Sequence, residues 1–156
     1  MKILCDQMFT RLGRWLRAAG YDTLIIDYPF SDRNIAALAL KERRFLVTRD
    51  RHFFDYPEVS DRLIWLKANS VEDCVKELST QLPLNWTLAP FSRCLLCNQQ
   101  LVSTTSKGLA LAPKEIRKRF HTFWLCCHCG KIYWQGSHTK KMLEALRSWN
   151  QIATHD

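Results

Sequence analysis

Short apolar runs alternate with longer amphipathic segments along the first half of the chain. The apolar runs occupy residues 2–5, 23–26, 45–47 and 63–66. Runs this short predict strands, and nearly continuous apolar character is typical of parallel strands that are covered on both faces. The segments between them are long enough for helices. The pattern therefore predicts an α/β fold, in which a small parallel sheet with right-handed crossovers is flanked by helices.

The expected helices have recognisable starts and ends. Thr10 is expected to cap a helix over residues 11–19 that ends at Gly20, where a left-handed residue can stop a helix. Ser31 is expected to cap a second helix, and Ser70 begins a capping-box sequence for a third. The first helix is expected to place three basic side chains opposite its apolar face: Arg11, Arg14 and Arg17.

Acidic residues follow the expected strands. Three of the four strands have an Asp at or just after the carboxyl end, namely Asp6, Asp27 and Asp50, and Asp32 lies in the first turn of the second helix. One such acid alone would more often be a turn former or a helix cap. Several carboxylates in one crevice raise each other's pKa unless a cation neutralises them, and open α/β sheets bind ligands at this edge. Because hard divalent cations prefer oxygen ligands, the pattern favours a Mg²⁺ or Mn²⁺ site.

Composition and charge narrow the function classes. The 156 residues are 47% hydrophobic, which predicts a packed core, and no run approaches the roughly 20 apolar residues of a membrane span. The net charge is +8, but residues 1–82 hold 13 Lys and Arg against 12 Asp and Glu, whereas residues 83–156 hold 10 against 3. Such asymmetry indicates a polyanionic partner, with nucleic acid as the expected one; the alternative is a solvated surface that only aids solubility.

The amino-terminal sequence lacks the features of a signal peptide, because Asp6 interrupts the first apolar segment. We therefore expect a cytoplasmic protein with no membrane partner. In that compartment the seven cysteines are expected to be thiols or metal ligands and not disulfides.

The composition changes at residues 83–93, where two prolines lie in a polar and aromatic segment. We expect this segment to link a domain over residues 1–82 to a second domain over residues 94–156. The second domain is expected to end in an amphipathic helix whose apolar side chains are Met142, Leu143, Leu146 and Trp149.

Four cysteines of the second half fall into two pairs, each with two residues between its members: Cys94 and Cys97, and Cys126 and Cys129. The 28 residues that separate the pairs exceed the commonest spacing, but an insertion between them is tolerable. Four thiolates satisfy a closed, tetrahedral zinc site, so the spacing predicts a structural zinc ribbon. Cys127 could take the place of Cys126 only by giving up the two-residue spacing.

Aromatic and basic residues lie close together around the second cysteine pair. Stacking platforms beside cations are typical of single-stranded nucleic-acid sites, although the tryptophans could instead pack a small domain with little other core. The candidate RNA contacts of this half are Lys114, Arg117, Lys118, Arg119, Trp134 and His138. Those of the first half are Arg11, Arg14 and Arg49.

These residues carry a resemblance to a known family. Asp32, followed by Thr48-Arg49-Asp50 and Phe53, resembles the C-terminal motif of PIN-domain nucleases. Nearly the whole chain resembles the PIN-like ribonuclease family named after the C-terminal domain of the Mut-seven protein. The matching segments are RLGRWLR from Arg11, GYDT from Gly20, SD from Ser31, TRDR from Thr48, FSRCLLC from Phe91, FWLC from Phe123, CG from Cys129 and YWQGSH from Tyr133.

The resemblance implies a metal-dependent ribonuclease in which Asp6, Asp32 and Asp50 bind Mg²⁺ or Mn²⁺ and a basic zinc ribbon aids RNA binding. PIN nucleases usually have a further acid, for which Asp27 and Asp55 are the candidates here. Two alternatives stay open. The chain could be an RNA-binding adaptor with little or no nuclease activity, or a phosphatase with Asp6 as nucleophile, although no second Asp follows two residues later to act as the acid.

Overall fold

The first half of the chain forms a four-stranded parallel sheet. In a computed structural model, which describes residues 1–26, 29–104 and 110–152, the strand order is β2-β1-β3-β4. All three strand pairs are parallel, as the apolar runs predict. The strands are β1 (Lys2–Cys5), β2 (Asp22–Ile25), β3 (Phe45–Thr48) and β4 (Leu63–Trp65).

Helices cover both faces of this sheet. Successive residues of β1 belong to two different apolar clusters, one on each face of the sheet. Ile3 and Cys5 pack with α1 (Thr10–Ala19) and α3 (Val71–Gln81), whereas Leu4 packs with α2 (Asp32–Lys41). Three short 3-10 helices complete this half, η1 (Gln7–Phe9), η2 (Arg51–Asp55) and η3 (Pro57–Arg62).

Most of the predicted helix ends are confirmed, with one exception. The Ser31 and Ser70 hydroxyls accept hydrogen bonds from the backbone N–H groups three residues later, and Gly20 ends α1 with a φ of 104°. Thr10 is not the cap of α1, because its hydroxyl donates to the carbonyl of Gln7. The preceding turn is capped instead by Asp6, so this aspartate opens η1 and thereby positions the start of α1.

The second half forms a small antiparallel sheet of β5 (Val102–Ser103), β6 (Phe123–Leu125) and β7 (Ile132–Trp134), beside the short helix α5 (Lys114–Arg119). Among the described residues, its apolar cluster contains only three buried ones, Ala112, Phe123 and Ile132. The same half holds four clustered cysteines that are consistent with a zinc ribbon, and so small a core is typical of domains that a bound metal stabilises.

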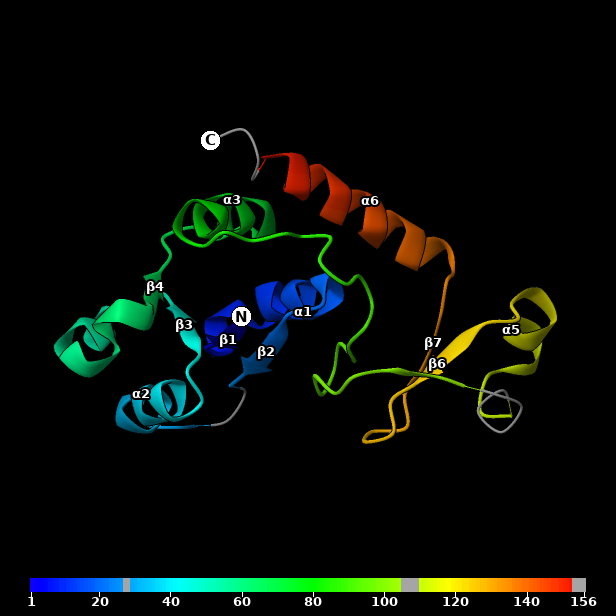
Figure 1. Ribbon diagram of the computed structural model, residues 1–156, viewed down its shortest axis with the longest axis horizontal. Helices are drawn as coiled ribbons and strands as arrows, with labels where there is room; N and C mark the ends of the chain where they lie inside the picture. Colours follow the sequence, from blue (N-terminus) through cyan, green and yellow to red (C-terminus); the bar gives the residue numbers. More distant parts are fainter. Residues whose placement is uncertain (27–28, 105–109, 153–156) are drawn as a thin grey trace.

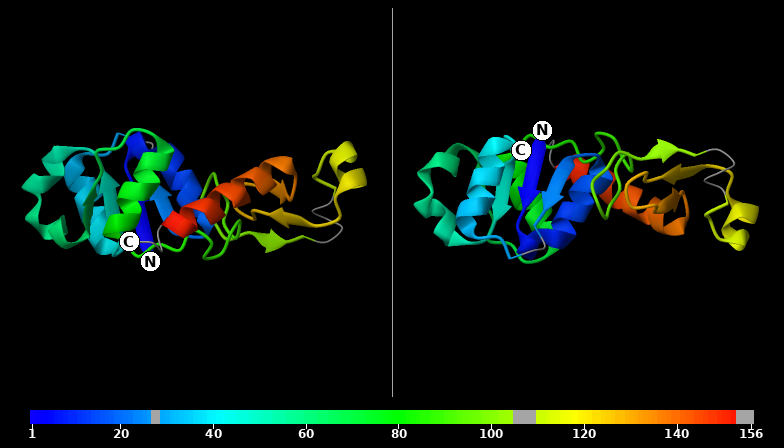
Figure 2. Two further views of the ribbon diagram at one scale, coloured as in Figure 1. Left: turned by 90° about the horizontal axis from the view of Figure 1, so that it is seen from above. Right: turned by 90° about the horizontal axis from the view of Figure 1, so that it is seen from below.

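Helix α6 (Ser137–Ile152) runs from the ribbon back over the parallel-sheet half, where it lies beside α3 (Figures 1 and 2). Leu146 and Trp149 are buried in the same cluster as α1 and α3, and the Trp149 ring lies 4.6 Å from the ring of Trp15. None of the helices formed by the described residues is long and apolar enough to cross a membrane.

Residues 83–93, which were expected to link the two domains, pack against the rest of the protein. Trp86 is completely buried, its indole N–H donates to the Ser79 hydroxyl, and its ring lies 5.4 Å from that of Trp149. The Phe91 N–H donates to the carbonyl of Ala18 at 2.8 Å. The segment is therefore packed along α1 and α6, while the domain boundaries at residues 82 and 94 stay a prediction.

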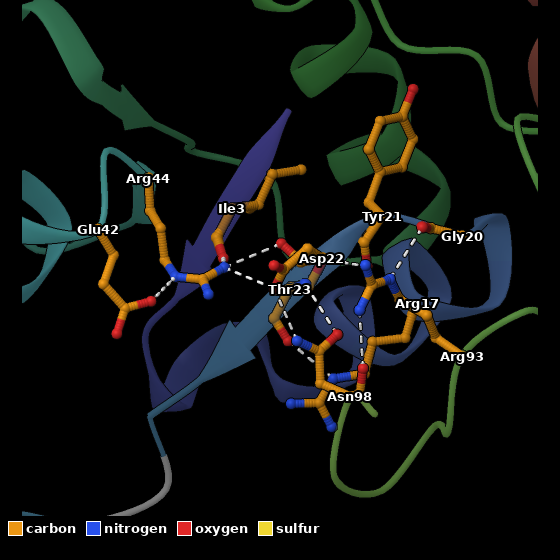
Figure 3. Close-up of polar contacts among 10 residues, drawn as sticks. All are labelled: Ile3, Arg17, Gly20, Tyr21, Asp22, Thr23, Glu42, Arg44, Arg93 and Asn98. Carbon is orange, nitrogen blue, oxygen red and sulfur yellow. Dashed lines mark hydrogen bonds and ion pairs between the residues drawn. The ribbon is translucent and has the colours of Figure 1, made fainter. Parts of the chain in front are cut away.

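The parallel-sheet half and the ribbon meet through buried polar contacts (Figure 3). Arg17 is only 5% exposed, although it was expected opposite the apolar face of α1. Its guanidinium donates to the carbonyls of Thr23, Leu95 and Leu96, so three backbone acceptors hold it inside the protein. The expectation for Arg17 was wrong because the ribbon covers that side of α1.

Candidate active site

The acidic residues gather at the topological switch point of the sheet. Strands β1 and β3 are neighbours, and the chain leaves β1 toward β2 but leaves β3 toward β4. Connections that depart in opposite directions open a crevice at the carboxyl ends of the two strands. A small pocket of about 110 Å³ lies there, and Asp6, Asp32 and Asp50 are among the residues that line it.

Asp6 is held in a fixed position directly after β1. Only 6% of the residue is exposed, and its backbone N–H donates to the carbonyl of Val47 in β3 at 3.2 Å. One carboxylate oxygen accepts the Met8 N–H at 2.8 Å, and the other accepts the Thr48 hydroxyl at 2.5 Å. Because both carboxylate oxygens accept a hydrogen bond, the side chain of Asp6 has a defined orientation at the pocket.

Thr48 connects the two strand-end acids. Its hydroxyl donates to Asp6 and accepts the N–H of Asp50 at 3.0 Å. The Asp50 carboxylate in turn accepts the N–H of His52 at 2.9 Å and so caps η2. Because 40% of the Asp50 side chain is exposed, it stays accessible to a ligand from solvent.

A group of side chains that could hold a metal ion lies beside this network. Carboxylate oxygens of Asp32 and Asp50 and a ring nitrogen of His52 all lie within 4.8 Å of one another, and the His52 Nδ1 is 3.2 Å from Asp50. The sequence analysis missed His52. The sequence feature that could have indicated His52 is its position two residues after Asp50, because this spacing places both residues at the start of η2.

The other acids and the arginines of the first half lie elsewhere. Asp55 is exposed and does not line the pocket, and Asp27 falls outside the described residues. The Arg49 guanidinium lies 5.2 Å from the centre of the Phe9 ring and donates to the carbonyl of Ala68, so it packs against the protein. Arg11 and Arg14 are exposed on α1.

The four cysteines of the two pairs come together at one end of the ribbon, with their Sγ atoms within 4.8 Å of one another. The Sγ atoms of Cys94 and Cys129 are 3.6 Å apart, and those of Cys97 and Cys126 are 3.3 Å apart. Tetrahedral Zn–S bonds of about 2.3 Å require sulfur separations of about 3.8 Å, so these thiols fit zinc closely. Cys127 is exposed and outside the cluster.

The two knuckles share one backbone geometry. In each, the residue after the second cysteine has a left-handed conformation, with φ of 71° at Asn98 and 72° at Gly130. The N–H of that residue donates to the carbonyl of the first cysteine, at 3.0 Å for Cys94 and 2.9 Å for Cys126. This repeat pairs Cys126 with Cys129, in the register that the two-residue spacing favours.

The Cys94 thiol lies in surroundings suited to a metal-binding thiolate. Burial acts to raise its pKa, but hydrogen bonds from the Tyr133 hydroxyl and from backbone N–H groups outweigh burial and lower the pKa to about 6. Loss of solvent around Cys97 and the neighbouring sulfur atoms raise the pKa of the Cys97 thiol. A bound cation would offset the mutual repulsion of the sulfurs if all four were ionised.

The remaining candidate RNA contacts lie on the ribbon and at the start of α6. The four cations of α5 project from a short helix at the far end of the ribbon (Figure 1). His138 is exposed at the start of α6, and Trp134 is half-buried beside the small ribbon core. These residues lie apart from the pocket that Asp6, Asp32 and Asp50 line.

Comparison with known families found a match along nearly the whole chain. The family model described as Mut7-C RNAse domain matches residues 1–146, and this range includes the three pocket aspartates and all four clustered cysteines. Comparison with curated proteins found no match, and comparison with solved structures found none either.

Proposed function

The chain belongs to the Mut7-C RNAse domain family, and from that premise we propose that it is a metal-dependent ribonuclease that hydrolyses phosphodiester bonds of single-stranded RNA. The observation that carries the proposal is the convergence of Asp6, Asp32 and Asp50 on one pocket at the switch point of the sheet. A family match alone would support the class of enzyme but not the place where the reaction occurs.

The residues of the pocket fit a hard divalent cation. Asp32 and Asp50 offer carboxylate oxygens within 4.8 Å of each other. Asp6 lies outside that cluster but lines the same pocket, where Met8 and Thr48 orient its carboxylate. Oxygen donors of this kind suit Mg²⁺ or Mn²⁺. When bound, such an ion would neutralise charge on the phosphate and make an attacking water more acidic.

The protein's own groups would orient the substrate and the acids. The Thr48 hydroxyl fixes the distance between Asp6 and Asp50, because it bonds to both residues. Met8 and Phe30 line the pocket while remaining 56% and 48% exposed, so they offer apolar surface to bases on either side of the scissile phosphate. In-line attack by water, as in the PIN nucleases that the chain resembles, would leave a 5′-phosphate and a 3′-hydroxyl.

The four-cysteine cluster has a separate role in this proposal. A closed site with four sulfur ligands leaves no position for a substrate, so zinc there would be structural. The chemistry is assigned to the parallel-sheet half, and the basic ribbon is assigned to RNA binding.

One observation favours a second function, that of an RNA-binding adaptor. Among the described residues, the pocket is lined by three acids and not by the fourth that PIN nucleases usually have, because Asp55 lies outside it. An adaptor would keep the basic ribbon and the zinc site while lacking turnover.

The two functions are separated by one assay. Protein dialysed against buffer without divalent ions is mixed with 5′-labelled single-stranded RNA, and Mg²⁺ or Mn²⁺ is then added. The ribonuclease proposal predicts cleavage only after the addition, with 3′-hydroxyl ends on the labelled fragments. RNA that is bound but stays intact would support the adaptor, and hydrolysis of a simple phosphate monoester without RNA cleavage would support a phosphatase.

A further inference from the structure

Three adjoining pockets form a groove where the ribbon, α6 and α1 meet. The first, of about 390 Å³, lies between the ribbon sheet, the segment around Phe91 and the start of α6. A second pocket extends it along α1, and a third extends it toward α5. His138 lines all three, so the pockets meet at this side chain. We call the surface that the three pockets share the ribbon groove.

Half-buried aromatic side chains form the wall of the ribbon groove. Trp124 and Tyr133 face each other across the β6–β7 pair, and Trp134 lies next to Tyr133. Trp124 packs into none of the three buried clusters of the described residues, whereas its neighbours Phe123 and Leu125 belong to the ribbon core. Its ring therefore adds little to the core and is available to the groove.

The position of Tyr133 is fixed by the cysteine cluster. Its hydroxyl lies 3.1 Å from the Cys94 sulfur and accepts the N–H of Leu95 at 3.1 Å. Because these contacts already hold the hydroxyl end of Tyr133, its ring is ordered before a ligand binds. The side chain therefore loses little further conformational entropy on binding. A fixed aromatic wall is a preorganised stacking surface.

The charges around the ribbon groove are all of one sign. Arg11 and Arg14 line the pocket along α1, and Arg119 and Lys131 line the pocket toward α5. No Asp or Glu is found among the described residues that line the three pockets. An apolar aromatic wall with a cationic border complements a polyanion that carries flat rings, which is single-stranded nucleic acid.

Helix α1 joins the ribbon groove to the acidic pocket. Asp6 lies directly before η1, which leads without interruption into α1, and Arg11 and Arg14 are exposed on successive turns of that helix. At about 1.5 Å per residue, Arg14 lies only about 6 Å along the axis from the start of α1. Both arginines therefore lie on the helix that begins beside the acidic pocket and borders the ribbon groove.

We propose that the ribbon groove is a nucleobase-binding site, in which a base of single-stranded RNA stacks on Trp124 while its phosphates follow Arg11 and Arg14 toward the acidic pocket. This inference rests on RNA as the substrate class of the proposed function. It adds that an unpaired base outside the cleavage site is recognised by stacking. Recognition of this kind selects single strands, because a base within a duplex cannot present its face to a side chain.

The test measures binding without cleavage. Protein without added Mg²⁺ or Mn²⁺ is titrated into two labelled ten-nucleotide RNAs of the same charge, one with bases throughout and one with abasic ribose in place of them. The wild type is expected to prefer the RNA with bases about 10- to 100-fold, which corresponds to stacking of one or two bases. Trp124→Ala is expected to lose most of this preference while its affinity for the abasic strand stays unchanged.

Matched variants separate stacking from general damage. Trp124→Phe keeps an aromatic face and is expected to retain most of the preference, and Leu88→Ala, which removes an exposed apolar side chain outside the groove, is expected to bind as the wild type does. Bound zinc and the unfolding midpoint report whether each variant is folded. Equal affinity of the wild type for the two RNAs would overturn the proposal, as would an undiminished preference in Trp124→Ala or selective binding of an acidic peptide. Since no divalent ion is added, failure of the ribonuclease proposal would appear separately, as bound but uncleaved RNA once Mn²⁺ is supplied.

Discussion

The guanidinium of Arg17 donates a hydrogen bond of 2.7 Å to the carbonyl of Leu96, which lies between the two cysteines of the first knuckle. The same nitrogen also donates to the carbonyl of Leu95, and Nε donates to Thr23 at the adjoining strand β2. One arginine of α1 therefore holds the inside of the cysteine knuckle against the edge of the parallel sheet. This contact is one of those that fix the ribbon against the parallel-sheet half.

Asn98 adds a second connection from the same knuckle. Its side-chain oxygen accepts the N–H of Thr23 at 3.0 Å, and its amide donates to Asp22 at 2.7 Å (Figure 3). The matching position of the second knuckle is Gly130, which has the same left-handed backbone. Asparagine tolerates this conformation and also carries a polar side chain, so the first knuckle can turn and bind the sheet at once.

Replacement of Arg17 tests this coupling. Arg17→Met is expected to lower the free energy of unfolding by about 2–4 kcal/mol, because three buried carbonyls lose a charged donor. Arg14→Met is the matched control on the same helix, and its exposed side chain should change stability by no more than about 0.5 kcal/mol. Urea unfolding of both variants gives the comparison. Equal stabilities of the two variants would show that Arg17 does not hold the halves together.

Asp22 gives a prediction about pH. Burial acts to raise the pKa of its carboxyl, but hydrogen bonds from Arg44 and Asn98 and the Arg44 charge outweigh burial and lower the pKa below the ordinary 3.8. A carboxyl whose pKa is lower in the folded state stabilises the protein fully above its unfolded pKa and loses this contribution as pH falls through its folded pKa.

Asp22→Asn is therefore expected to be less stable than the wild type at pH 7, and the difference should shrink as the pH falls below about 4. Denaturant unfolding at a series of pH values measures this difference. Asp61→Asn, at an exposed position, is the control with little expected difference at any pH. A stability difference that grows on acidification would contradict the assigned role of Asp22.

The cysteine register gives a prediction with a neighbouring control. Cys126→Ser is expected to lose zinc and to unfold the ribbon, because structural zinc contributes folding free energy directly. Cys127→Ser is expected to keep one zinc per chain, since Cys127 lies exposed outside the cluster. Elemental analysis of the purified variants decides between them. Loss of zinc from Cys127→Ser, with zinc retained in Cys126→Ser, would instead identify Cys127 as the ligand.

The basic helix α5 is expected to supply affinity and not chemistry. Replacing Lys114, Arg117, Lys118 and Arg119 by Gln should weaken RNA binding and reduce the slope of log affinity against log salt by up to about 3, at about 0.7 per phosphate contact. Cleavage at saturating RNA should change far less. A control that removes four exposed cations of the parallel-sheet half should leave the slope nearly unchanged; these cations are Lys2, Lys41, Arg43 and Lys76. An unchanged slope in the α5 variant would place the basic surface elsewhere.

Local signals in the sequence predicted much of the fold. Ser31, Ser70 and Gly20 act within one helical turn of their own positions, and each forms the predicted cap or stop. The cysteine spacing is also local, because each knuckle closes over a few residues. Such features depend little on the rest of the chain, so they can be recognised before the fold is known.

Features that depend on distant partners were not predictable in the same way. Arg17 is buried by carbonyls 78 and 79 residues away, and Trp86 by a ring of α6. His52 joins Asp32 only after α2 and η2 have packed on the same side of the sheet. The pattern of apolar runs predicted acids at the strand ends. The connection of Asp6 and Asp50 through the Thr48 hydroxyl could not be predicted, because it depends on the register between β1 and β3.

The proposed active site depends most on Asp50, and a comparison of two variants tests this dependence. Asp50→Asn keeps the size of the side chain but removes the charge that a divalent cation requires, so Mn²⁺-dependent cleavage of single-stranded RNA should fall by at least about 100-fold. Asp55→Asn is the matched control, because Asp55 lies exposed at the other end of η2 and outside the pocket. Both variants should bind zinc and RNA as the wild type does. Cleavage lost in Asp50→Asn and kept in Asp55→Asn is the predicted result, and undiminished cleavage by folded Asp50→Asn would contradict the proposed active site.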